Sequence, residues 1–102
     1  MENNIINLED IISKGAVIID VRTKGEFDSG HIHGSLNIPI DELGKNLSWL
    51  VKEVPTVVCC ASGSRSEMAK FILQANGFKE VYNGGAWDSL GNIKVGACPI
   101  KH

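Results

Sequence analysis

Two adjacent cysteines, Cys59 and Cys60, are the residues of this sequence with the clearest capacity for chemistry. They close the apolar run at residues 56–60, and six small or polar residues follow before a helical pattern is established. A cysteine between a strand end and a helix start lies near the positive end of the helix dipole, which lowers the pKa of its thiol. The pattern therefore predicts that Cys60 is a nucleophilic thiolate.

The six residues after Cys60 are suited to binding an anion. Their small side chains, with Gly63 among them, allow successive backbone N–H groups to point inward and form an anion-binding nest. The helix start adds unpaired N–H groups, and Arg65 adds a positive charge at the same place. Ligands of open α/β sheets bind at the carboxyl ends of strands, so this turn is the expected site. We expect its chemistry to need neither a metal nor an organic cofactor.

The remaining cysteines are not expected to build a site of their own. Three cysteines cannot complete a disulfide framework, and adjacent cysteines do not readily pair with each other. Cys59 is predicted to be a buried core residue, and Cys98, beside Pro99, is predicted to have no role. Paired C-x-x-C motifs are absent from the sequence and its histidines lack zinc-finger spacing, so no metal site is expected.

Strands and helices alternate along the chain, an order that places such a turn at the edge of a sheet. The runs at 16–21 and 56–60 are apolar without alternation, as in parallel strands covered on both faces. The other elements are predicted from apolar periodicity and from glycine or proline stops: strands at 5–6, 35–38 and 80–82, helices at 8–14, 41–53 and 66–76, and a helical turn at 24–29. Together they predict a small α/β domain with helices on both faces of a parallel sheet.

The composition is that of one ordinary globular domain. The chain has 102 residues, of which 43% are hydrophobic and 22% charged, with a net charge of −2. This charge balance argues against a nucleic-acid-binding face. The N-terminus lacks a signal-peptide pattern, and no apolar run approaches the roughly 18 residues of a membrane span. We therefore expect a single domain over residues 1–102 that is cytoplasmic and monomeric, with neither nucleic acid nor membrane as a partner.

The segment Cys60-Ala61-Ser62-Gly63-Ser64-Arg65-Ser66 resembles the active-site loop of the rhodanese-like sulfurtransferases. Other segments resemble further motifs of that family in the same order along the chain: IDVR at 19–22 with EF at 26–27, GHIHGSLNIP at 30–39, and GF at 77–78 with VYNGGAW at 81–87. The resemblance covers residues 8–90. It implies a rhodanese-like fold, a five-stranded parallel sheet flanked by helices on both faces.

The resemblance also implies a two-step transfer of sulfur. The Cys60 thiolate would attack the sulfane sulfur of thiosulfate or a similar donor, and cyanide or a cellular thiol would accept that sulfur from the resulting persulfide. The resemblance therefore implies a thiosulfate:cyanide-type sulfurtransferase, a rhodanese, with Cys60 and Arg65 as its expected catalytic residues. A thiol-carrying protein is a further candidate partner. The expected substrate-binding residues are those of the nest: Ala61, Ser62, Gly63, Ser64 and Ser66.

Several residues outside the loop are interpreted as structural. Asp20 ends a buried strand, and Arg22 is expected to pair with Glu26 and so to fix the loop that follows. Trp87 is expected to pack beside the site. Met68 is expected to belong to the core, on the apolar face of the helix at 66–76.

Other interpretations stay open from the sequence alone. Counted from Cys59, Arg65 lies six positions on, which matches the C-x5-R-[ST] pattern of cysteine phosphatases; some of these, and arsenate reductases, share the fold. Val58 stands where such phosphatases usually carry a histidine, which favours the count from Cys60. A sulfur carrier loaded by a protein partner and a non-catalytic rhodanese-like binding module are further alternatives, since fold alone does not fix function.

Overall fold

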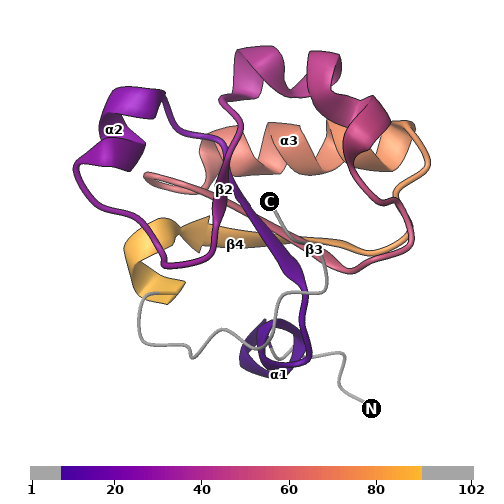
Figure 1. Cartoon of the computed structure of the whole chain (residues 1–102), viewed down its shortest axis with the longest axis horizontal. Coiled ribbons are helices and arrows are strands. Elements are labelled where there is room, and N and C mark those ends of the chain that lie inside the picture. The colour runs from indigo at the N-terminus through magenta and orange to yellow at the C-terminus, as the bar shows by residue number, and fades with distance from the viewer. Residues whose placement is uncertain (1–7, 91–102) are drawn as a thin grey trace.

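The computed structural model describes residues 8–90, which form a parallel sheet between two layers of helices (Figure 1). Its strands, in the spatial order β2-β1-β3-β4, are β1 (Val17–Asp20), β2 (Leu36–Asn37), β3 (Thr56–Cys60) and β4 (Val81–Ala86). Its helices are α1 (Leu8–Ser13), α2 (Lys24–Asp28), the 3₁₀ helix η1 (Ile40–Trp49), α3 (Ser64–Ala75) and the 3₁₀ helix η2 (Trp87–Leu90). None of these helices is long and apolar enough to cross a membrane.

The predicted α/β class and parallel sheet are confirmed, with a correction to the number of strands. The described residues contain four paired strands where five are expected, and the strand predicted at residues 5–6 lies outside the described residues. The two central strands, β1 and β3, are buried along their whole length. Burial on both faces is why their sequences show no polar alternation.

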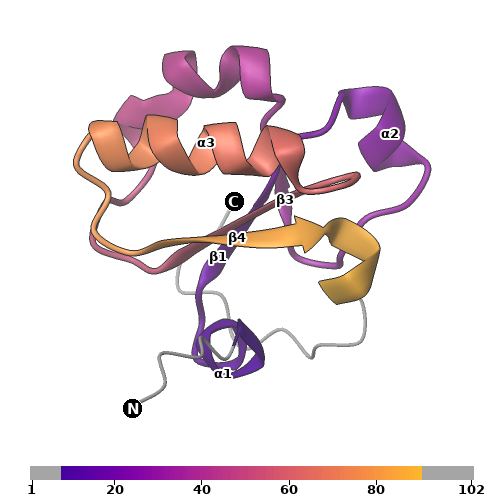
Figure 2. The same ribbon diagram turned by 180° about the vertical axis from the view of Figure 1, so that it is seen from behind.

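The two faces of the sheet are covered by different helices (Figures 1 and 2). The α3-side core joins the sheet to η1 and α3, and includes Cys60 with Leu43 and Leu73. The α1-side core joins the sheet to α1 and η2, and includes Cys59 with Ile12. Because successive side chains of a strand point to opposite faces, the two adjacent cysteines enter different cores.

The helix before β3 differs from its prediction. The sequence predicts an α-helix over residues 41–53, whereas the structure has the 3₁₀ helix Ile40–Trp49. The Asn46 side chain explains part of the difference, because its Nδ2 donates to the Glu42 carbonyl at 2.8 Å and takes the acceptor that an α-helical N–H would use. Gly44, in the middle of the segment, weakens an α-helix further.

Strand β4 is longer than its sequence predicts, because the two glycines after Asn83 stay in the sheet instead of turning away. Val58 pairs with Asn83 and Cys59 pairs with Gly85, so Gly84 is an extra residue and β4 carries a bulge. A bulge re-aims the side chains beside it. Here it lies directly opposite the end of β3 that carries the cysteines.

Helix α3 begins at Ser64, two residues before the predicted start, with Gly63 as its N-cap. The helix turns Met68 outward and leaves it 60% exposed, so the expectation that Met68 belongs to the core is wrong. The predicted apolar face is displaced because the buried positions of the helix follow a different stripe: Ser66, Ala69 and Leu73.

Candidate active site

Cys60 is the last residue of β3, and its side chain lies fully buried beneath the turn that leads into α3. The Gly63 N–H donates to the Cys60 Sγ at 2.9 Å, and the thiol in turn donates to the Ser66 Oγ at 3.6 Å. Burial raises the pKa of Cys60, but hydrogen bonding with the Ser66 side chain and with backbone N–H groups at Ser66, Gly63 and Ser62 outweighs it. The pKa of Cys60 is therefore lowered, and the turn stabilises a thiolate.

The turn takes this shape because of the backbone at Gly63. Its φ is +106°, a left-handed conformation that residues with a side chain rarely adopt. This conformation directs the Gly63 N–H to the sulfur, while its carbonyl accepts the N–H of Glu67 at 3.1 Å and starts the helix. The exposed outer side of the turn is formed by Ala61, Ser62 and Ser64.

Arg65 holds the turn to helix α2. Its Nη1 and Nη2 donate to the two carboxylate oxygens of Glu26 at 2.9 and 3.2 Å. Glu26 also closes the N-terminal cap of α2 by accepting the Thr23 N–H at 2.9 Å. The Arg65 hydrogen bond is the main reason that the pKa of Glu26 falls to about 2. The partner expected for Glu26 was Arg22, and this expectation is wrong because the Glu26 carboxylate faces the turn instead.

Arg22 pairs with Asp20 in the interior. Asp20 is fully buried and Arg22 is 4% exposed, and the Arg22 Nη2 donates to an Asp20 oxygen at 2.7 Å. The guanidinium also donates to the backbone carbonyls of Gly30 and Glu26, and it lies 4.5 Å from the centre of the Trp87 ring. These contacts fix the segment around α2, so both residues have the structural role expected of them.

Cys59 has a different environment from Cys60. It is fully buried in the α1-side core, as predicted, and burial raises the pKa of its thiol to about 12. A thiol with this pKa stays protonated at neutral pH and is a poor nucleophile. Cys59, the cysteine from which the phosphatase pattern is counted, is therefore unreactive, and its side chain lies on the opposite face of the sheet from that of Cys60.

Two residues that complete the site were not identified from the sequence as part of it. Glu26 pairs with Arg65 and not with Arg22, and Asn83 of β4, for which the sequence predicts no role, accepts a hydrogen bond from the Ser66 Oγ at 2.6 Å. The Asn83 contact depends on the bulge in β4; Gly84 and Gly85 are a local sign of such a bulge but do not specify which residues it brings together.

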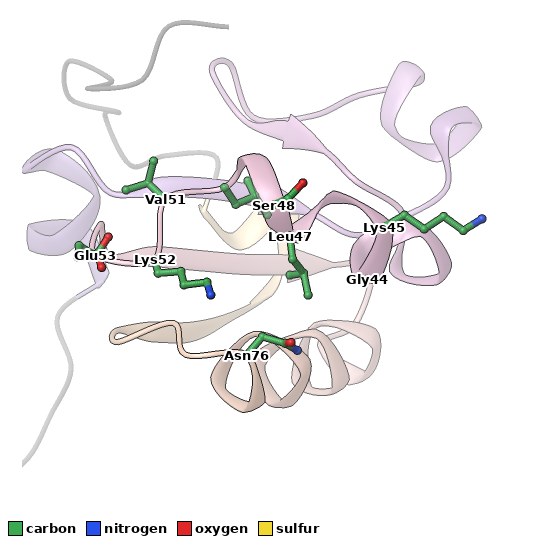
Figure 3. Close-up of a pocket in the computed structure, with 9 residues that line it drawn as sticks. Gly44, Lys45, Leu47, Ser48, Val51, Lys52, Glu53 and Asn76 are labelled. Atoms are coloured by element: carbon green, nitrogen blue, oxygen red, sulfur yellow. The ribbon is translucent and has the colours of Figure 1, made fainter.

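A surface cavity of about 650 Å³ lies between η1, the chain that follows it and the far end of α3 (Figure 3). Leu47, Lys52 and Asn76 are among its lining residues. None of its lining residues belongs to the Cys60 turn, so we assign it no part in thiol chemistry. Within residues 8–90, no three His, Cys, Asp or Glu side chains cluster closely enough to hold a metal ion.

Comparison with known proteins gives consistent matches. A family model described as the rhodanese-like domain matches residues 6–86. The uncharacterized protein YqhL of Bacillus subtilis (strain 168) is 38% identical over 82 residues, which cover 78% of this chain and 65% of YqhL, just under two thirds of that relative. The thiosulfate sulfurtransferase PspE of Escherichia coli (strain K12) is 33% identical over 79 residues, 76% of each chain.

A solved structure supports the same assignment. A rhodanese with anions from E. coli superposes with a TM-score of 0.71 at 29% identity, covering 81% of this chain and 100% of that one. Sequence and backbone thus lead to the same assignment, and we conclude that this chain belongs to the rhodanese-like family.

Proposed function

We propose that this protein is a sulfurtransferase that carries sulfane sulfur as a persulfide on Cys60. The observation that carries the proposal is the hydrogen bond from the Gly63 N–H to the Cys60 Sγ at 2.9 Å, within a turn whose backbone lowers the pKa of that thiol. The name of the related thiosulfate sulfurtransferase PspE supports this class of reaction. Thiosulfate, or a donor with a similar anionic leaving group, is the proposed substrate.

In the first step, the Cys60 thiolate attacks the outer sulfur of thiosulfate. A bond forms between the two sulfur atoms, the original sulfur–sulfur bond of thiosulfate breaks, and sulfite leaves with its electron pair. Arg65 stands at the rim of the turn and retains N–H groups beyond those used on Glu26, so it is the proposed contact for the anionic donor.

In the second step, a thiolate or cyanide attacks the outer sulfur of the persulfide, and the Cys60 thiolate leaves. The persulfide anion needs the same stabilisation as the thiolate, and the N–H groups of the turn supply it without rearrangement. A thiol-carrying protein is an equally suitable acceptor, because the exposed side of the turn is uncharged at Ala61, Ser62 and Ser64. A reducing compartment such as the cytoplasm suits a free reactive thiolate.

The alternative interpretations make different demands on the site. A phosphatase or arsenate reductase would use Cys59, whose raised pKa and position in the opposite core oppose that role. A non-catalytic module would have no need of a lowered pKa at Cys60, and this favours the catalytic proposal.

The proposal is tested by incubating the protein with thiosulfate and recording its intact mass. We expect an adduct of one sulfur atom, about 32 Da, that cyanide removes with release of thiocyanate. Cys59→Ser is the matched control and keeps the adduct, whereas Cys60→Ser abolishes it. An adduct that survives in Cys60→Ser, or aryl phosphate hydrolysis that depends on Cys59, would rule the proposal out.

A further inference from the structure

Asn83, on β4 across from the Cys60 turn, uses all four hydrogen-bonding positions of its side-chain amide. Its Nδ2 donates to the Gly63 carbonyl at 3.1 Å and to the Glu67 carboxylate at 2.9 Å. Its Oδ1 accepts the Ser66 hydroxyl at 2.6 Å and the Gly85 N–H at 2.8 Å. A part-buried amide with a full set of partners is held in one orientation.

Asn83 binds the two residues that contact the Cys60 sulfur, Gly63 through its carbonyl and Ser66 through its hydroxyl. The Gly63 N–H lies 2.9 Å from Sγ, and the Ser66 Oγ lies 3.6 Å from it. A glycine has little conformational preference of its own, and Gly63 caps α3 without a side-chain hydrogen bond. The conformation of Gly63 therefore depends on groups outside the turn, and Asn83 binds its carbonyl, in the peptide unit next to the one that donates to the sulfur.

The bulge in β4 is what brings Asn83 to this position. The extra residue, Gly84, shifts the register next to Cys59, and Gly85 then follows with a φ of +77°. A Cβ placed on Gly63 would lie 3.4 Å from the Gly85 Cα, so the bulge and the turn pack backbone against backbone. Asn83 links the two, since it bonds to the Gly85 N–H and to the Gly63 carbonyl.

We propose that Asn83 is a positioning residue for Cys60: by binding the Gly63 carbonyl and the Ser66 hydroxyl it fixes the turn in which the Gly63 N–H points at the sulfur. The consequence of this role for sulfur transfer rests on the proposed function, whereas the effect of Asn83 on the Cys60 thiol is independent of it. Asn83 makes no contact with the reacting sulfur itself that the structure records; it acts through Gly63 and Ser66.

Charged and titratable groups near Cys60 also influence how its alkylation rate depends on pH. They come from the three elements nearest the turn: Arg65 and Glu67 on α3, Glu26 on α2, and Cys59 on β3. The part of η1 that packs on the same core is apolar. Because Asn83 is uncharged, replacing it leaves every one of these charges in place. A change in the Cys60 profile then reports the altered hydrogen bonds.

The test compares Asn83→Ala with the matched control Asn76→Ala, at the far end of α3. Alkylation of Cys60 by iodoacetamide is followed from pH 5 to pH 10 by peptide mass spectrometry. Loosening the turn weakens a hydrogen bond to a charged sulfur, so we expect alkylation about tenfold slower below the midpoint, with an unchanged plateau at high pH. Asn76→Ala should follow the unmodified protein. Coincident profiles for Asn83→Ala and the unmodified protein, or faster alkylation of Asn83→Ala through a Ser66 hydroxyl freed to donate to the sulfur, would overturn the proposal.

A second measurement needs no substitution at Asn83 and covers the case in which Asn83→Ala does not fold. In the unmodified ¹⁵N-labelled protein, the side-chain amide signals of Asn83 should move with the titration of Cys60, and those of Asn76 should not. If the Asn83 signals do not shift as Cys60 titrates, the proposed positioning role is contradicted. Neither measurement requires sulfur transfer. If the protein fails to take sulfur from thiosulfate, the proposed function is refuted, but the positioning role of Asn83 is not.

Discussion

The buried ion pair between Asp20 and Arg22 gives a prediction whose size can be worked out from its contacts. The Asp20 carboxylate accepts hydrogen bonds from the Arg22 Nε at 2.9 and 3.1 Å, from Nη2 at 2.7 Å, and from the Arg22 backbone N–H at 3.1 Å. Asp20→Asn keeps the shape of the side chain but removes its negative charge. It also places an NH₂ donor opposite a donor of the Arg22 guanidinium. The buried guanidinium is then left without a counter-ion.

Removing one partner of a buried pair costs about 3–5 kcal/mol, a large share of the roughly 5–15 kcal/mol that stabilises a domain. Because asparagine keeps one acceptor, we expect a loss near the lower end, about 3 kcal/mol in the free energy of unfolding. For a chain of this size that lowers the Tm by about 12–24 °C. Urea unfolding at pH 7 and a thermal melt measure the two quantities.

The exposed pair between Lys24 and Asp28, at 2.8 Å, supplies the control. Both of these side chains are more than half exposed, so Asp28→Asn should cost at most about 1 kcal/mol. The double variant Asp20→Asn/Arg22→Met should be less destabilised than the sum of its single variants, because it no longer buries an unpaired charge. If Asp20→Asn costs no more than Asp28→Asn, the argument from burial is refuted.

Three further predictions concern the turn and its neighbours. Gly63→Ala forces a side chain into a left-handed backbone, so it should destabilise the protein by about 1–2 kcal/mol and slow the alkylation of Cys60 at pH 7; an unchanged rate would contradict the role of its N–H. The pKa of Glu26 is lowered to about 2, so its pairing with Arg65 contributes stability above the unfolded pKa, near 4.5, and loses it as the pH falls toward 2. The gap in urea midpoint between Glu26→Gln and the unmodified protein should therefore be full at pH 7 and smaller at pH 3, and an equal gap at both would refute the linkage. Cys59→Ala should leave the pH profile of Cys60 alkylation unchanged while costing about 1–2 kcal/mol in urea unfolding, and a displaced profile would show that Cys59 takes part.

The parts of this structure that follow from local chemistry are predictable from the sequence. The buried strands β1 and β3 are recognisable because strands covered on both faces have no polar side to display. The turn after Cys60 is recognisable because its small residues, Gly63 and the helix start are contiguous. Assigning the two cysteines to opposite cores needs only the alternation of side chains along a strand.

The contacts that complete the site are not local, and this is why sequence patterns do not reveal them. Glu26 and Arg65 are 39 positions apart, and Glu26 has a closer arginine in the sequence, at Arg22, with which it does not form an ion pair. Asn83 reaches Ser66 across 17 positions through a bulge that inserts one residue into β4. A pattern of residue types does not specify such pairings, because they depend on how separate elements pack.

The central claim is that Cys60, and no other cysteine, receives the sulfur. The most direct test is to treat the unmodified protein with thiosulfate, cap its thiols, and locate the added sulfur by fragmenting the peptide between Cys59 and Cys60. We expect about 32 Da of added mass on Cys60 alone. Sulfur found on Cys59 or Cys98, or a chain that gains none, would contradict it.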